Sequence, residues 1–296
     1  MYNCVKLGTL TRIRTGKLDA NASSTDGAYP FFTCSREVLR IATYSYDCEC
    51  VLVAGNGDLN VKYYAGKFDA YQRTYIIESI DKSKLLAKYL YFFLDIYVEV
   101  LRTQSIGGVI KYIKLGNLAD ALIPLPGIEK QAEIVDCLET CNVIIDRIQQ
   151  QLTKLDELVK SRFVEMFGDP VQNPNGWHTN SLMEMGYCKN GMNFRNGDSG
   201  ITLHCLGVGD FKDFSIINGT EQLPIVSLNE TPSEESMLRD GDIVFVRSNG
   251  NKALVGRCLI VYPHDTPTTY SGFCIRYRLT SNVINADYLV RVLKTD

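Results

Sequence analysis

The side chains of this chain best suited to binding another molecule lie in a glycine-bounded loop. The stretch GDIVFVRSNGN at 241–251, followed by lysine, supplies Arg247, Ser248, Asn249, Asn251 and Lys252. A guanidinium can donate two parallel hydrogen bonds to guanine, an asparagine amide can pair in the same way with adenine, and lysine can hold a phosphate. These side chains are suited to hydrogen bonding with the polar groups of a partner such as nucleic acid.

The first part of the chain offers similar side chains around its own Asn-Gly pair. The counterparts are Asn56, Asn60 and Lys62, and further candidates on or beside predicted loops are Lys17, Tyr71, Gln72, Arg73 and Lys111. For any single one of them, a solvated surface residue or a turn-forming Asn-Gly pair is an equally good interpretation. The prediction of a binding surface therefore applies to the set.

Motifs for catalysis or for binding a cofactor are weak by comparison. Gly207-Val208-Gly209-Asp210-Phe211 has no lysine at P-loop spacing, and is more simply a turn. Asp169-Pro170 and Asn173-Pro174 lack the second proline and the aromatic residue of an adenine methyltransferase site. Cys48-x-Cys50 has no second cysteine pair or histidine at zinc spacing, so we expect reduced, mostly buried thiols and no metal. We expect no catalytic residues and no cofactor in this chain.

The binding loops must be positioned by larger elements, and the most regular of these is a long helix. Between about Glu129 and Phe167, apolar residues recur at alternating gaps of four and three, the a/d pattern of a coiled coil. The predicted seam comprises Ile134, Leu138, Cys141, Ile145, Ile148, Leu152, Leu155 and Val159. At about 1.5 Å per residue such a helix is roughly 58 Å long, which favours a spacer over a core helix of an α/β protein.

A weak internal repeat flanks this helix. Thr15-Gly16 matches Asn190-Gly191 at an offset of 175, the Asn-Gly pairs match at 193, and residues 85–90 match 284–289 at 199. Steadily growing offsets indicate loop insertions in one shared fold. We therefore predict an α+β protein in which two β-rich, mixed α/β domains, 1–122 and 169–296, are separated by a long coiled-coil spacer helix at 123–168. By the last offset, the second domain is expected to be incomplete at its C-terminal end.

Charge and hydropathy limit the choice of partner and compartment. The net charge is −3, but residues 1–122 carry 15 Lys and Arg against 12 Asp and Glu, so the first domain is mildly basic. Residues 123–168 carry 5 against 8 and are acidic. The chain contains no run of 18 apolar residues, and Met1–Lys6 lacks the layout of a signal peptide, so we expect a cytoplasmic protein without a membrane segment.

Two stretches carry a family resemblance. IPLPGIEKQAEIV at 123–135 and LDELVKSRFVEMFGDPVQNPNGW at 155–177 resemble the first conserved helix region of the specificity subunit of type I restriction–modification systems. GDIVFVRSNGN and the Gly107-Gly108 stretch resemble target recognition domains of that family, so the resemblance covers nearly the whole chain. The conserved helix region that would follow the second domain in that family has no counterpart in this chain.

The resemblance implies a non-catalytic subunit that recognises double-stranded DNA. Each domain would read half of a split site, with the helix setting the gap, and methyltransferase (M) and restriction (R) subunits would dock beside them. S-adenosylmethionine would bind the methyltransferase subunit. The alternative is a coiled-coil adaptor that binds proteins through its two globular domains without recognising DNA.

The exposed seam of the helix predicts one more partner. In a second copy, the same helix packed antiparallel would cover the seam and give a symmetric homodimer. Arg162 would then face the start of the partner's helix, where Glu133, Asp136 and Glu139 could pair with it. A parallel pair would stack Arg162 on itself.

Overall fold

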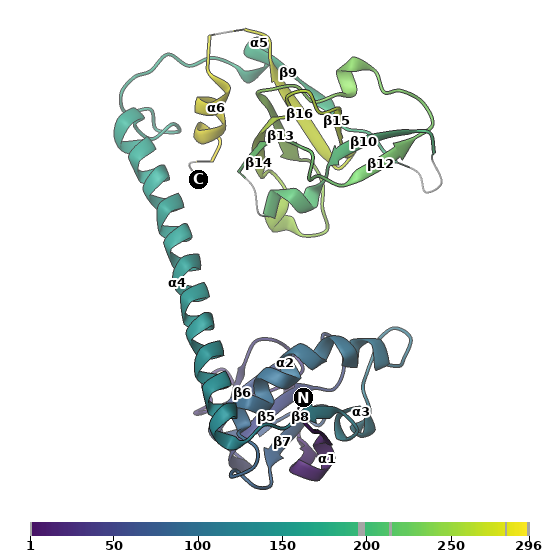
Figure 1. The fold of residues 1–296 in the computed structure, drawn as a ribbon. Coiled ribbons are helices and arrows are strands. Elements are labelled where there is room, and N and C mark those ends of the chain that lie inside the picture. The colour runs from purple at the N-terminus through teal and green to yellow at the C-terminus, as the bar shows by residue number, and fades with distance from the viewer. Residues whose placement is uncertain (1, 195–198, 213–214, 282, 295–296) are drawn as a thin grey trace. The chain divides into compact units, whose positions relative to one another are not determined.

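The computed structural model describes residues 2–194, 199–212, 215–281 and 283–294. The chain forms two compact units, unit 1 (Met1–Gln149) and unit 2 (Gln150–Asp296), and Figure 1 shows the elements of each. The division falls inside the long helix α4 (Ile128–Phe167), because each unit includes the end of the helix that packs on it. The domain limits expected at residues 122 and 168 therefore stay a prediction.

Unit 1 is built on a six-stranded sheet with helices on one face. The strand order is β2 (Thr11–Thr15), β7 (Thr74–Ser79), β5 (Tyr46–Ala54), β6 (Val61–Ala70), β3 (Tyr29–Phe32) and β4 (Leu39–Ile41). Side chains alternate between the faces of β5. Val51 and Val53 pack against α2 (Ala87–Gln104), whereas Cys50 and Leu52 face an aromatic cluster on the other side.

Short elements complete unit 1. They are β1 (Cys4–Lys6), α1 (Leu7–Leu10), η1 (Ala20–Ala22), α3 (Leu115–Ala119) and β8 (Leu122–Pro124). β1 pairs with β8, and together they cover Leu7, which is fully buried. Within residues 5–13 a helical turn, α1, separates β1 from β2 and places Leu7 in the core.

Unit 2 contains a five-stranded and a three-stranded sheet. The first has the order β11 (Ile216–Asn218), β14 (Cys258–Tyr262), β13 (Asp242–Val246), β16 (Cys274–Leu279) and β9 (Gly186–Asn190). The second has the order β12 (Ile225–Leu228), β10 (Ile201–Leu206) and β15 (Thr268–Tyr270). Its helices are α5 (Leu182–Met185) and α6 (Ala286–Val292), with η2 (Val208–Lys212), η3 (Glu234–Ser236) and η4 (Lys252–Leu254) in loops.

Equivalent backbone hydrogen bonds occur within each of the two units. Gly16 N–H donates to the Thr74 carbonyl at 3.0 Å, and Gly191 N–H donates to the Cys274 carbonyl at 3.1 Å. A Cβ on either glycine would lie 2.1 Å from a backbone oxygen, so both positions need glycine for the same close approach. The repeat seen in the sequence thus corresponds to a repeated local structure.

Unit 2 differs from unit 1 in what covers its short first helix. Leu182 of α5 occupies the place of Leu7 and is 37% exposed, because no strand pair like β1–β8 covers α5 among the described residues. The expectation that the second copy lacks the last strands of the first stays a prediction.

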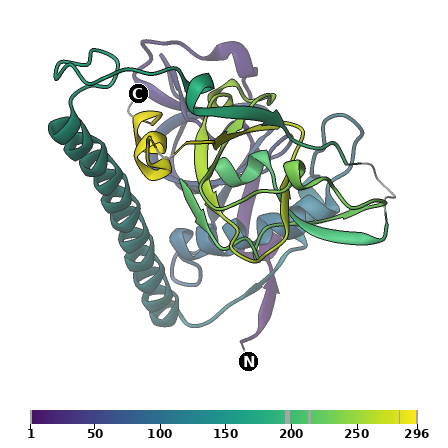
Figure 2. The same ribbon diagram turned by 90° about the horizontal axis from the view of Figure 1, so that it is seen from above.

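Helix α4 is a continuous helix of 40 residues (Figures 1 and 2). In unit 1, Gln131 and Val135 are buried; in unit 2, the Phe163 ring packs against Phe167 and Tyr288, with centroids 4.9 and 5.4 Å away. The helix ends at Gly168, which has a left-handed φ of 81°. Between these ends, every residue from Thr140 to Arg162 is exposed.

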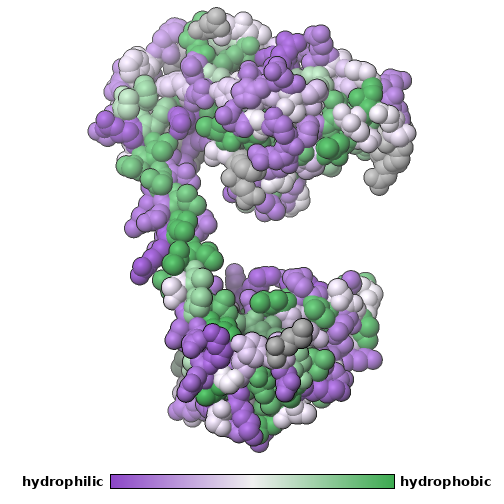
Figure 3. All heavy atoms as spheres, in the orientation of Figure 1, coloured by the Kyte–Doolittle hydropathy of each residue, from purple (hydrophilic) through white to green (hydrophobic). Residues whose placement is uncertain are grey.

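The exposed stretch of α4 includes most of the predicted seam. Ile134 and Leu138 are half-buried, whereas Cys141, Ile145, Ile148, Leu152, Leu155 and Val159 are exposed. Figure 3 shows hydrophobic side chains running along the helix. Arg162 pairs with Glu165 at 2.7 Å within the same helix. Among the described residues, every helix is too short or too polar to span a membrane.

Candidate nucleic-acid interface

Four loops of unit 1 meet at one end of the strands of its sheet. We call this surface loop edge 1, and it comprises residues 16–19, 55–58, 70–73 and 106–112. Backbone hydrogen bonds tie them together, from Gln72 N–H to the Leu18 carbonyl and from Gly55 N–H to the Arg73 carbonyl, both at 2.8 Å. Gly57 N–H donates to the Lys111 carbonyl at 2.9 Å. Segments far apart in the sequence are therefore held as one surface.

Most of the first-domain candidates lie on loop edge 1. Lys17, Gln72, Arg73 and Lys111 are exposed, and Tyr71 and Asn56 are half-buried. Gln72 Nε2 donates to Asp19 Oδ1 at 2.9 Å, so this amide is paired within loop edge 1. The structure thus brings together three cations and several planar polar groups, the side chains that DNA contacts require.

Asn60 and Lys62 lie apart from this group and hold a neighbouring loop. Asn60 is 8% exposed, and its Nδ2 donates to the Cys34 and Asp58 carbonyls, both at 2.9 Å. Lys62 Nζ donates to the Ser35 carbonyl at 2.7 Å, and desolvation by burial lowers the pKa of its ammonium. In this conformation both side chains are occupied within unit 1.

Acidic and basic side chains also pair beside Asn56. The Asp58 carboxylate accepts from Arg36 Nε at 2.8 Å, and this hydrogen bond lowers the pKa of Asp58. Arg102 Nη2 lies 3.3 Å from the same carboxylate. Arg36 and Arg102 are 22 and 44 residues from Asp58, so no local sequence pattern could have placed these two cations beside the edge.

Unit 2 has an equivalent surface, loop edge 2, made by residues 191–193, 247–252 and 271–273. Arg247 N–H donates to the Phe273 carbonyl at 2.8 Å, which repeats the contact between Gly55 and Arg73 in unit 1. This equivalence gives an offset of 192, so unit 2 has one extra residue before its Asn-Gly pair. Loop edge 2 therefore begins at the same strand end as loop edge 1.

All five second-domain candidates are exposed on loop edge 2. Arg247 Nη2 donates to the Gly272 carbonyl at 2.7 Å, which fixes the guanidinium at the edge. Asn249 Oδ1 accepts from Asn251 N–H at 2.7 Å, and Asn251 Oδ1 caps η4 at Ala253 N–H. The two asparagines thus shape the loop, while Ser248 and Lys252 extend from it.

The sequence reasoning missed the exposed apolar residues of both edges. Phe273 on loop edge 2 is 58% exposed, and Val109 and Ile110 protrude from loop edge 1. An apolar residue normally signals core, and only the glycine pair at Gly107-Gly108 hinted that this stretch is a surface turn.

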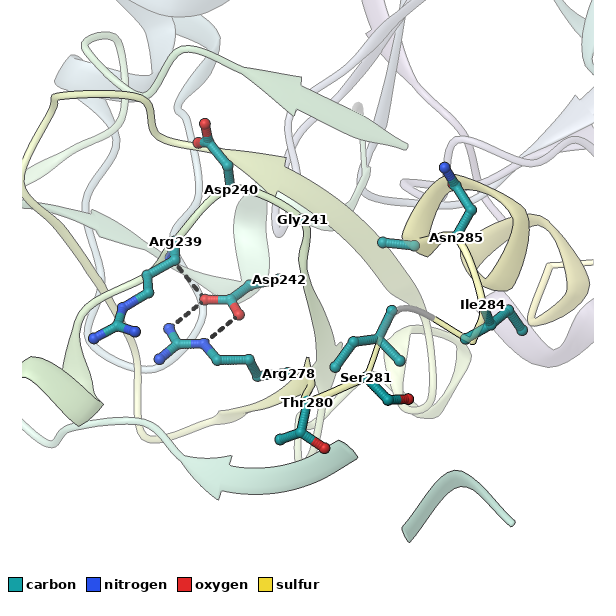
Figure 4. Close-up of a pocket in the computed structure, with 11 residues that line it drawn as sticks. Arg239, Asp240, Gly241, Asp242, Arg278, Thr280, Ser281, Ile284 and Asn285 are labelled. Carbon is teal, nitrogen blue, oxygen red and sulfur yellow. Dashed lines mark hydrogen bonds and ion pairs between the residues drawn. The ribbon is translucent and has the colours of Figure 1, made fainter. Parts of the chain in front are cut away.

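A pocket of unit 2 lies at the opposite ends of β13 and β16, away from loop edge 2. It has a volume of about 580 Å³ and is lined by Asp242, Arg278, Thr280, Ser281 and Asn285, among others (Figure 4). Two hydrogen bonds of 2.7 Å join the Arg278 guanidinium to the Asp242 carboxylate. This ion pair holds the start of β13 to the end of β16 at the base of the pocket.

No group of three or more metal-ligating side chains occurs among the described residues. The ten cysteines are all free thiols, and burial raises the pKa of Cys205 and Cys274 to about 12, which keeps them protonated at neutral pH. The exposed side chains of the two loop edges are suited to hydrogen bonding and charge pairing.

Comparisons with known proteins agree with this arrangement. Residues 2–157 match the family described as "Type I restriction modification DNA specificity domain". The chain is 38% identical over 159 residues to the "Type I restriction enzyme EcoDI specificity subunit" of Escherichia coli, covering 54% of this chain and 35% of that protein. It is 27% identical over 213 residues to the "Type I restriction enzyme StySPI specificity subunit" of Salmonella potsdam, covering 66% and 44%.

One solved structure shares the fold over the whole chain. The S subunit of the type I restriction–modification system from M. genitalium aligns with a TM-score of 0.55 and 16% identity, covering 100% of this chain and 77% of that one. This likeness supports the α+β architecture with a long helix. The chain spans less than half the length of each of the two specificity subunits that it matches in sequence.

Proposed function

The chain belongs to the type I restriction–modification DNA specificity family, and from this premise we propose that it recognises a bipartite DNA sequence as the specificity subunit of such a system. Loop edge 1 reads one half of the site, loop edge 2 reads the other, and α4 sets the gap between them. The observation that carries the proposal is the repeat of the same strand-end geometry, Gly55 to Arg73 and Arg247 to Phe273, with basic and planar polar side chains at both places.

The division of labour in the complex follows from the side chains present. Asparagine, glutamine and arginine can read base edges, and Lys17, Lys111 and Lys252 can hold phosphates. Methyl transfer and cleavage are the work of methyltransferase and restriction subunits that dock on this chain, with S-adenosylmethionine in the methyltransferase subunit. The complex acts on genomic DNA in the cytoplasm.

Affinity for DNA depends on those partners. A chain of net charge −3 makes few phosphate contacts, and phosphate contacts supply most of the non-specific affinity. The isolated chain therefore binds duplex DNA weakly, and assembly with two methyltransferase subunits tightens binding. The exposed seam of α4 further supports an antiparallel homodimer when no other helix covers it.

The test is to express the chain with a type I methyltransferase subunit from the same genome and to sequence the methylated positions in the host DNA. A methylated motif with two defined halves and a fixed gap is expected. Exchanging Arg247, Ser248 and Asn249 for alanine should change only one half. Unmethylated DNA, together with salt-independent binding, would instead favour a coiled-coil adaptor that binds proteins.

A further inference from the structure

The loop between α2 and α3 carries two apolar side chains that do not pack into the core of unit 1. We call Val109 and Ile110 the apolar tip; their exposed fractions are 104% and 63%. Single exposed apolar residues are normal on protein surfaces. Two adjacent branched side chains at the end of one loop, however, form a compact apolar projection that contact with another molecule would cover.

The apolar tip is held by a rigid turn. Gly107 has a φ of 116°, and a Cβ there would lie 2.5 Å from the Ile110 carbonyl oxygen, so the turn requires glycine. Ile106 and Tyr112 close the loop with two backbone hydrogen bonds of 3.0 and 2.8 Å. The tip is therefore presented in a defined position.

Polar and basic residues of loop edge 1 surround the base of this turn. Lys111 follows the tip directly and its carbonyl accepts from Gly57 N–H, while Ile113 N–H donates to the Gly55 carbonyl at 2.9 Å. Arg73 is joined to the same Gly55. An apolar projection beside two exposed cations matches a ligand that presents a small apolar group between anionic groups. Duplex DNA has one such apolar group, the 5-methyl of thymine in the major groove, between phosphates.

We propose that Val109 and Ile110 pack against the 5-methyl group of a thymine and so contribute to the specificity of the half-site that unit 1 reads. The inference rests on the proposed function, because it requires that loop edge 1 faces duplex DNA. It adds an apolar contact to the hydrogen bonds that Asn56, Gln72 and Arg73 can offer.

The experiment replaces each thymine of the recognised motif in turn with deoxyuridine, which removes only the methyl group. Affinity is measured by fluorescence anisotropy, with the chain assembled with its methyltransferase subunits. For one position in the unit 1 half-site, the duplex with deoxyuridine should bind about fourfold more weakly than the duplex with thymine, because burial of one methyl group contributes about that much affinity. The double variant Val109→Ser, Ile110→Ser should bind both duplexes equally.

The matched control is Ile96→Ser, which changes a 76% exposed apolar residue of α2 in the same unit and should keep the fourfold discrimination. Specific binding without any thymine-to-deoxyuridine effect, or a half-site without thymine, would overturn the inference and leave the proposed function intact. Loss of assembly with the methyltransferase subunits in the double variant would make the tip a protein-docking surface and overturn it too. Absence of sequence-specific binding by the wild-type complex would remove the proposed function itself.

Discussion

The side chain of Gln131 and the backbone of Leu86 are joined by a hydrogen bond of 3.0 Å at a position where Gln131 has no exposed surface. The same amide donates to the Lys84 and Pro126 carbonyls at 2.7 and 2.9 Å. Leu86 precedes the first turn of α2, and Gln131 lies in the first turn of α4. One buried amide thus fixes the start of the long helix onto unit 1.

Replacing Gln131 with alanine should loosen this junction. The change removes the partner of the Leu86 N–H and of the Lys84 and Pro126 carbonyls, of which the Pro126 bond is buried and the other two are part-buried, and each unsatisfied buried group costs roughly 1–3 kcal/mol. We expect the opening free energy of the first turns of α2 and α4 to fall by about 3 kcal/mol. Amide hydrogen exchange of residues 84–90 and 128–135 in the full chain would measure it.

Gln150→Ala, on the exposed part of the same helix, is the control and should leave exchange at both places unchanged. Equal protection in the Gln131→Ala variant and the wild type would mean that apolar packing around Val135 alone holds the junction.

The phosphate contacts of loop edge 1 should appear in the salt dependence of DNA binding. Lys111→Ala and Arg73→Ala each remove one exposed cation. If each holds one phosphate, the slope of log affinity against log salt should decrease by about one unit per substitution. The control is Lys82→Ala. Lys82 is not part of loop edge 1, and its Nζ lies 2.7 Å from Glu49 Oε2, so its removal should leave the slope unchanged. An unchanged slope in both edge variants would place the phosphates elsewhere.

Local patterns predicted the long helix and the repeat, because their causes are local. A seam of alternating three- and four-residue gaps needs only helical geometry, and Gly16 and Gly191 mark turns that need glycine. The candidate site was only partly predictable. Asn60 looks like a loop residue in the sequence, but Cys34, 26 residues away, supplies the carbonyl that draws its amide inside. Contacts of that range leave no periodic signal.

The same limit explains why the apolar tip was missed and the loop edges were not. Asn-Gly and Gly-Gly pairs predict turns, so the residues beside them could be proposed as surface groups. Whether Val109 points to solvent or to core depends on the closure of its loop onto Gly55–Gly57, a tertiary contact.

The length of α4 should be read out as the gap of the methylated motif. Inserting four residues after Gln150 lengthens the helix by roughly 6 Å, close to two base pairs at about 3.4 Å each. We expect a longer gap with both half-sites unchanged. A substitution at the same place, Gln150→Ala, serves as control. The same gap in the insertion variant would show that α4 does not set the spacing.

The exposed seam of α4 leads to a prediction about assembly. Ile145, Ile148, Leu152 and Leu155 are each at least 50% exposed in the single chain. Fully burying such a side chain gains roughly 1.5–3 kcal/mol relative to leaving it exposed. A helix surface of this kind should therefore be covered, and without partner subunits we expect an antiparallel pair formed with the α4 of a second copy.

Ile148→Glu should break that pair, because it would place a charge in the centre of the seam. Light scattering at tens of micromolar should give a dimeric mass for the wild type and a monomeric mass for the variant. Ile96→Glu, on the solvent face of α2, should stay dimeric.

Ion pairs should add little to this dimer. Two of the acidic groups that would meet the partner's Arg162 are already paired, Glu133 with Lys130 and Glu139 with Lys88. Dimerisation would therefore exchange one set of exposed ion pairs for another, and exposed ion pairs contribute little. The apolar seam should then dominate, and the dimer should persist in high salt. A monomeric wild-type chain would mean that the seam is reserved for the helices of the methyltransferase subunits or another partner.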